Sequence, residues 1–208
     1  SLDSAAMLIS CPVEFKFTKE LPTSVSVTMT PCEMATNRFK IIDNHPKEGE
    51  RKKQFGICMK QIVFEDRDYA IRFIEWVHIM RILGVEKIHF YNKFVHPDLF
   101  EIFNYFEQKG WIEVLPFLEP SGMSFSDPKK FRSTEKLSVE LTMMTDCFYR
   151  VRNLYNYIVA IDSDEIIMPL KDEDTNLLDL LRHVEDLPNK DFIMLRSVTF
   201  HPKKSSSA

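Results

Sequence analysis

Apolar residues recur along this chain with two alternating periods, one typical of β-strands and the other of helices. Runs rich in β-branched and aromatic residues predict strands at 55–64, 85–91, 111–115, 157–161 and 192–198. Apolar positions at helical spacing predict helices at about 67–83, 98–109, 133–150 and 176–184. Strands that alternate with helices indicate an α/β fold with a doubly wound, mostly parallel sheet and helices on both faces.

The first 53 residues follow a different pattern. Val25, Val27 and Met29 alternate with polar residues, which predicts an edge hairpin or two strands, and a polar, turn-rich stretch follows. The lysine- and serine-rich end is typical of a frayed terminus. We therefore predict a β-rich extension packed on the main domain at 1–53, an α/β domain at 54–200 and a disordered tail at 201–208.

Composition narrows the class of protein. The 208 residues, 44% of them hydrophobic, are enough for one well-filled core and few for two. The net charge of −4 is spread without long like-charge blocks, which argues against a nucleic-acid partner. No apolar run approaches the roughly 20 residues that span a bilayer, so we expect membrane anchoring only through a segment upstream of Ser1.

The four cysteines leave two interpretations open. Cys11, Cys32, Cys58 and Cys147 are too far apart for a C-x-x-C zinc or redox motif. They fit buried free thiols. They also fit two disulfides in any of three connectivities, which would suit an oxidising secretory compartment.

The strongest chemical signal is the D-S-D-E sequence that directly follows the apolar run 157–161. Asp162 and Asp164 are two residues apart, so in an extended chain their carboxylates leave on the same side. Hard divalent cations such as Mg²⁺ or Mn²⁺ bind one or two such carboxylates together with substrate phosphates. For an isolated D-x-D motif, a solvated turn is nevertheless favoured by about three to one, because short motifs often match by chance.

Other motifs change these odds, because their order and spacing are similar to those of one family. They are F-I-E-W at 73–76, L-G-V at 83–85, F-Y-N at 90–92, H-P-D at 96–98, D-C-F-Y-R at 146–150 and D-S-D-E-I-I-M-P at 162–169. The chain resembles glycosyltransferase family 92, formerly domain of unknown function 23, from about Cys11 onward. The resemblance implies a GT-A type fold and inverting transfer of a hexose, most characteristically galactose, from a UDP-sugar to a glycan acceptor.

The resemblance also implies roles for individual residues. Asp164 would bind Mn²⁺ or Mg²⁺ directly, and Asp162 would contact the metal, a metal-bound water or the ribose. Asn92 and Asp98 would contact the uracil and ribose of the donor, and Glu165 would support the donor or acceptor side. Two simpler interpretations stay open: Asp98 as a helix cap and Glu165 as a surface turn residue. The family implies residence in the Golgi lumen of the secretory pathway, as a type II membrane protein in full-length form.

An inverting transferase also needs a general base for the acceptor hydroxyl, and no residue of the chain is assigned to that role. We expect this base downstream of the D-S-D-E sequence and outside this chain, as in a C-terminally truncated domain or a member that has lost activity. The alternative is a degenerate donor-site module that binds nucleotide or glycan without turnover. A phosphohydrolase of the haloacid dehalogenase type is disfavoured, because Ile166 replaces its expected threonine and its motif belongs on the first strand.

Overall fold

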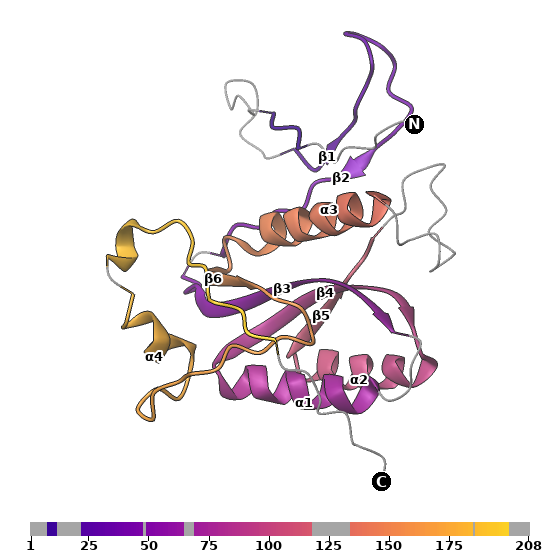
Figure 1. Ribbon diagram of the computed structural model, residues 1–208. Coiled ribbons are helices and arrows are strands. Elements are labelled where there is room, and N and C mark those ends of the chain that lie inside the picture. Colours follow the sequence, from indigo (N-terminus) through magenta and orange to yellow (C-terminus); the bar gives the residue numbers. More distant parts are fainter. Residues whose placement is uncertain are drawn as a thin grey trace. The chain divides into compact units, whose positions relative to one another are not determined.

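The computed structural model describes residues 8–11, 22–47, 49–64, 69–117, 134–184 and 186–199. The chain forms two compact units, Ser1–Met168 and Pro169–Ala208. The first unit contains the main sheet and its helices, and the second contains two short helices (Figure 1). The predicted division at residue 53 stays a prediction, and the predicted tail at 201–208 lies outside the described residues.

Within the described part of the first unit, four parallel strands form the main sheet in the order β5-β4-β3-β6. They are β3 (Lys53–Phe64), β4 (Val85–Val95), β5 (Ile112–Leu115) and β6 (Tyr155–Ala160). The first three strands are added in one direction, whereas β6 lies on the other side of β3. Strand order therefore reverses between β3 and β6, and open α/β sheets bind ligands at such a switch point.

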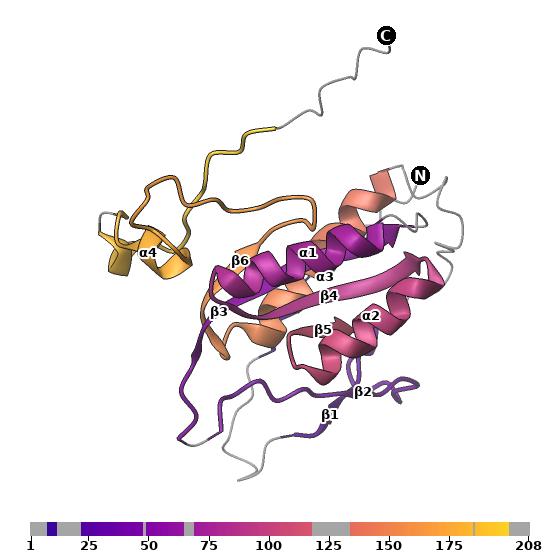
Figure 2. The ribbon, with the colours of Figure 1, turned by 90° about the horizontal axis from the view of Figure 1, so that it is seen from below.

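Helices cover both faces of this sheet (Figures 1 and 2). Helices α1 (Tyr69–Ile82) and α2 (Pro97–Gln108) lie on one face, and α3 (Thr134–Val151) lies on the other. The predicted parallel α/β architecture with helices on both faces is thus confirmed. Among the helices that the structure describes, none combines the length and apolar character needed to span a membrane.

Aromatic side chains fill the interface between the sheet and helices α1 and α2. Phe73 of α1 is fully buried, and its ring centroid lies 5.8 Å from that of Phe90 and 5.2 Å from that of Phe103. The Phe90 and Phe103 rings are 5.0 Å apart. All three pairs are edge-to-face, an arrangement that adds specific attraction to the burial of apolar area.

A disulfide joins sheet and helix on the opposite face. Cys58 of β3 is bonded to Cys147 of α3, and both are buried in a core cluster with Tyr91, Met143 and Tyr155. Cys11 and Cys32 are free and exposed. The structure therefore lies between the two predicted interpretations, with one disulfide and two free thiols.

The N-terminal segment contains two short antiparallel strands, β1 (Ser24–Val25) and β2 (Phe39–Lys40). The predicted alternation extended to Met29, but strand pairing stops after Val25. Beyond that point, the Asn37 side chain accepts a hydrogen bond from Val27 N at 2.8 Å and donates one to Val27 O at 2.6 Å. A side chain thus satisfies backbone groups that a longer strand would have paired.

In the second unit, helix α4 (Leu177–Leu181) begins at Asn176, whose side chain accepts hydrogen bonds from Leu178 N and Asp179 N. A 3₁₀ helix, η2, follows at Leu187–Asn189. The predicted strand at 192–198 is wrong, because these residues form no strand. Phe192 and Met194 are 78% and 85% exposed, so the apolar side chains of this segment are not buried as those of a core strand would be.

Candidate functional site

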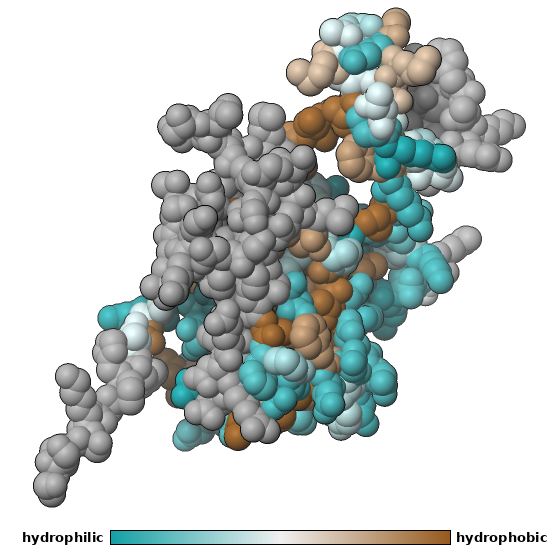
Figure 3. Space-filling model, turned by 90° about the vertical axis from the view of Figure 1, so that its right-hand side faces the viewer, coloured by the Kyte–Doolittle hydropathy of each residue, from teal (hydrophilic) through white to brown (hydrophobic). Residues whose placement is uncertain are grey.

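The D-S-D-E turn, residues 162–165, follows β6 at the switch point of the sheet. Ala160, the last residue of β6, pairs with Cys58 of the central strand β3. Asp162 therefore emerges just beyond the carboxyl end of β6, beside the last third of β3, which continues to Phe64. On the side toward which β3 and β4 end, polar side chains lie among apolar ones (Figure 3). The D-S-D-E turn thus occupies the position where this class of sheet binds ligands.

Hydrogen bonds within the turn hold its two ends together. Glu165 N donates to Asp162 O at 3.1 Å, and Asp162 N donates to the Glu165 carboxylate at 3.2 Å. The Glu165 side chain is thereby used to shape the turn. This geometry supports the simpler interpretation of Glu165 as a turn residue.

Helix α1 fixes the same turn through two aromatic residues. Trp76 Nε1 donates to Glu165 O at 2.8 Å, and the Tyr69 hydroxyl donates to Ser163 Oγ. Tyr69 and Trp76 are both buried, so these anchors are part of the core. Neither residue was among the predicted site residues, although their seven-residue separation places both on one helix face.

A lysine on the central strand contacts the first aspartate. Lys60 Nζ lies 2.7 Å from Asp162 Oδ2 and 3.9 Å from Glu140 Oε2 of α3. Lys60 was not among the predicted site residues. Its place inside the apolar run 55–64 was a usable signal, because a lysine there needs a partner for its charge. Asp164, in contrast, is exposed.

Charge and burial shift two pKa values around the turn. Burial raises the pKa of the Tyr69 phenol to about 12, and the charges of Asp164 and Asp162 act in the same direction, so this phenol keeps its proton and donates. Burial alone would lower the pKa of Lys60. The hydrogen bond and charge of Asp162, with the charges of Glu140 and Asp164, outweigh burial and raise the Lys60 pKa overall.

Asn92 lies near the carboxyl end of β4, opposite Ile62 of β3. Its Oδ1 atom is buried and has no hydrogen-bond partner among the described residues. Tyr91 packs with residues of α3, so strand alternation places Asn92 on the other face of the sheet, the face covered by α1 and α2 (Figure 1). The D-S-D-E turn is hydrogen-bonded to α1 and also reaches Lys60 through Asp162. Two strand spacings, about 10 Å, separate β4 from β6. Asn92 and Asp162 therefore lie near the ends of different strands at one edge of the sheet.

Asp98 lies in the first turn of α2, but it is not the N-cap. His96 is the N-cap, and its Nδ1 accepts a hydrogen bond from Asp98 N at 3.3 Å. The capping interpretation of Asp98 was therefore wrong by two residues. An acidic side chain in the first turn still favours the helix through its dipole.

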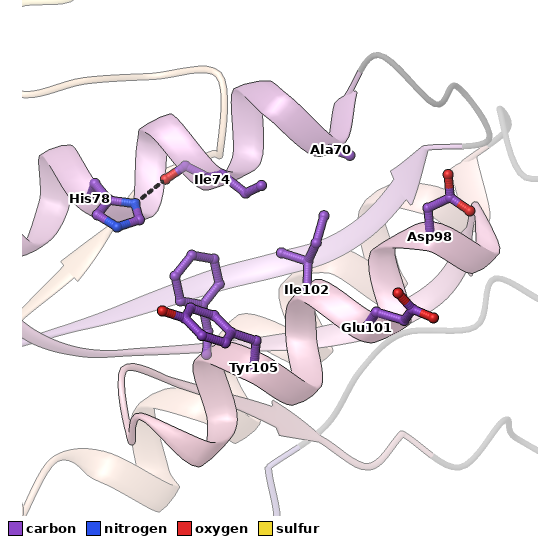
Figure 4. A pocket seen from close by; sticks show the side chains of 8 residues that line it. Ala70, Ile74, His78, Asp98, Glu101, Ile102 and Tyr105 are labelled. Atoms are coloured by element: carbon purple, nitrogen blue, oxygen red, sulfur yellow. Dashed lines mark hydrogen bonds between the residues drawn. The ribbon is translucent and has the colours of Figure 1, made fainter.

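Asp98 also lines a pocket of about 600 Å³ between α1 and α2. Figure 4 shows Ala70, Ile74 and His78 on α1 facing Asp98, Glu101 and Tyr105 on α2. His78 Nδ1 contacts the carbonyl oxygen of Ile74 at 2.8 Å. No residue of the D-S-D-E turn lines this pocket.

The D-S-D-E turn could bind a metal ion through the carboxylates of Asp162 and Asp164. Among the described residues, no three His, Cys, Asp or Glu side chains converge on one point. Asp162 and Asp164 nevertheless offer only oxygen donors, which fit a hard divalent cation whose other ligands come from substrate phosphates and water. A site of this kind is completed by its substrate.

Comparison with known proteins identifies the family. No curated protein and no solved structure matches the chain. The model of glycosyltransferase family 92 matches residues 53–208, which include the whole four-stranded sheet and the D-S-D-E turn. The parallel sheet flanked by helices agrees with the Rossmann-like GT-A fold that the resemblance implied. The chain belongs to glycosyltransferase family 92.

Proposed function

We propose that this glycosyltransferase moves a hexose, galactose, from a UDP-sugar to a glycan acceptor with inversion, in a reaction that depends on Mn²⁺ or Mg²⁺. The observation that carries the proposal is the position of the D-S-D-E turn. It lies at the switch point beside β3, in a chain of a glycosyltransferase family. The sugar and the metal are inferred from the resemblance and from the carboxylate donors.

In this proposal Asp164 and Asp162 hold the metal. A divalent cation held by these two carboxylates would neutralise the negative charge that develops on the diphosphate leaving group. The exposure of Asp164 supports a direct ligand role, since its carboxylate is open to a ligand. Tyr69 and Trp76 hold the turn, so that the two carboxylates are positioned before the donor binds.

Asn92 is proposed to contact the uridine part of the donor. Its buried Oδ1 has no partner among the described residues, and an unsatisfied acceptor in this position is costly unless a ligand donates to it. The uracil N–H and the ribose hydroxyls are donors of the required kind. Asp98 keeps its proposed ribose contact, and Glu165 is proposed to act by shaping the turn.

The disulfide supports a location in the secretory pathway. A buried bond between Cys58 and Cys147 persists in oxidising compartments and is rare in the cytosol. This agrees with the proposed Golgi lumen, where the full-length protein would be held by a membrane anchor upstream of Ser1.

A second candidate is a module that binds nucleotide or glycan without turnover. One observation favours it: Lys60 already pairs with Asp162, which gives this carboxylate a role in the unliganded protein. Turnover separates the two candidates. Release of UDP from UDP-galactose is measured with and without Mn²⁺ and a glycan acceptor, in wild type, Asp164→Ala and the control Asp172→Ala, an exposed aspartate of the second unit.

The transferase proposal predicts metal-dependent UDP release that Asp164→Ala reduces by at least about 100-fold, the scale of losing an electrostatic contact to the leaving group. Asp172→Ala should behave as wild type. UDP binding without any UDP release would support the non-catalytic module instead.

A further inference from the structure

Lys60 occupies an unusual position for a lysine. It follows three buried residues of the central strand β3, Ile57, Cys58 and Met59, which are at most 1% exposed. Its own side chain is 34% exposed, so the ammonium reaches the surface beside Asp162, four residues before β3 ends at Phe64. The strand thus delivers a cation from the core to the edge where the D-S-D-E turn lies.

Acidic side chains surround this ammonium. It lies 2.7 Å from Asp162 and 3.9 Å from Glu140, and Asp164 is two residues from its main partner. A nucleoside diphosphate adds further negative charge to the same edge. Such a ligand can bind there only if cations face its phosphates, and one divalent metal shared by two carboxylates leaves much of that charge uncompensated.

We propose that Lys60 is a donor-binding residue that exchanges Asp162 for the diphosphate of the sugar nucleotide when the metal takes the Asp162 carboxylate. The inference rests on the proposed function. The lysine stem is flexible, and its ammonium binds phosphate as a point charge. A small rotation can therefore move the ammonium from a carboxylate oxygen of Asp162 to a phosphate oxygen of the ligand. In the unliganded protein Lys60 keeps Asp162 compensated, and in the complex it faces the substrate.

The test compares Lys60→Met and Lys60→Arg with a matched control, Lys87→Met. Lys87 lies on the neighbouring strand β4, and its Nζ is 3.8 Å from Glu113 rather than from the turn. UDP affinity at saturating Mn²⁺ and Mn²⁺ affinity without UDP are measured by calorimetry. Thermal unfolding checks that each variant is folded.

We expect Lys60→Met to weaken UDP binding about tenfold or more, the scale of one charge-assisted hydrogen bond, and to leave Mn²⁺ binding unchanged or stronger. Lys60→Arg should stay within about threefold of wild type, because it keeps the charge. Wild-type UDP affinity in Lys60→Met would overturn the inference. A parallel loss of Mn²⁺ and UDP affinity would also overturn it, because it would show that Lys60 only orients Asp162.

A second measurement uses wild-type protein and does not depend on the variants folding. Acylation of Lys60 and Lys87 by a lysine-selective reagent is followed by mass spectrometry. UDP with Mn²⁺ should slow acylation of Lys60 but not of Lys87, whereas Mn²⁺ alone should not protect Lys60. Equal protection with and without UDP would contradict the inference. Absence of any UDP binding to wild type would instead overturn the proposed donor site.

Discussion

The indole nitrogen of Trp76 donates a hydrogen bond to the carbonyl oxygen of Glu165 at 2.8 Å, which joins helix α1 to the D-S-D-E turn. The two residues are 89 positions apart in the chain. A buried aromatic side chain thus fixes the backbone of an exposed acidic turn. The turn is held by the core, which distinguishes it from a solvated loop.

Removal of this hydrogen bond should loosen the turn. We expect Trp76→Phe to lower the free energy of unfolding by about 1–3 kcal/mol, because a partly buried hydrogen bond is lost and the smaller ring leaves space in the core. UDP affinity in the presence of Mn²⁺ should fall as well. Urea denaturation and calorimetry measure the two effects. The control is Trp111→Phe, which changes the indole that stacks on Phe106 and should leave UDP affinity unchanged. Unchanged UDP affinity in Trp76→Phe would show that Trp76 does not hold the turn in its binding conformation.

The disulfide should be a major source of stability. Cys58 and Cys147 are separated by 89 positions, and in the chain-entropy model a loop of this length contributes about 4.6 kcal/mol. The double variant Cys58→Ala, Cys147→Ala should therefore unfold at much lower denaturant concentration. The control pair Cys11→Ala, Cys32→Ala should be near wild type. Four reactive thiols in the unfolded, unreduced protein would contradict the assignment.

Gly56 should not accept a side chain. A Cβ atom at this position would lie 2.7 Å from the ring of Tyr155, which is buried and whose hydroxyl lies 3.0 Å from His89 Nε2. We expect Gly56→Ala to destabilise the protein by about 1–3 kcal/mol, as for other overpacked cores. In a double-mutant cycle with Tyr155→Leu, the combined effect should be smaller than the sum of the two single effects. Additive effects would show that the two positions do not clash.

Acid should weaken the second unit through Asp179. Its carboxylate accepts hydrogen bonds from Thr175 N at 2.9 Å and Thr175 Oγ1 at 3.0 Å, and these bonds hold its pKa below the usual 3.8. Because the folded pKa is lowered, the contribution to stability is present above pH 3.8 and is lost as the pH falls through the folded pKa. Asp179→Asn should remove this dependence. The chemical shift of the Thr175 amide, followed by NMR against pH, reports the titration of Asp179. A titration midpoint at or above pH 3.8 would contradict the lowered pKa.

Much of the sheet could be predicted, because its strands are buried and their apolar runs are long. The predicted strand at 85–91 corresponds to β4, which continues to Val95. The predicted strand at 157–161 corresponds to β6, which begins two residues earlier and ends one residue earlier. The run at 192–198 has the same kind of pattern but forms no strand. A periodic pattern reports what a segment can bury, whereas strand formation also needs a neighbouring strand to pair with.

The site was predictable only in part for a similar reason. Residue order places Asp162 and Asn92 at strand ends, but it does not say which side chains of other elements lie beside them. The partners that shape the turn, Lys60, Tyr69 and Trp76, come from β3 and α1, far away in sequence. Such contacts follow from the crossover of the fold, and no local motif encodes them.

The most direct test of the proposed donor site is calorimetric titration of UDP into wild type and Asp164→Ala, with and without Mn²⁺. The proposal predicts that wild type binds UDP only when Mn²⁺ is present and that Asp164→Ala loses at least about tenfold in affinity, equivalent to about 1.4 kcal/mol. UDP binding that is independent of the metal, or no UDP binding by folded wild type, would contradict the proposal.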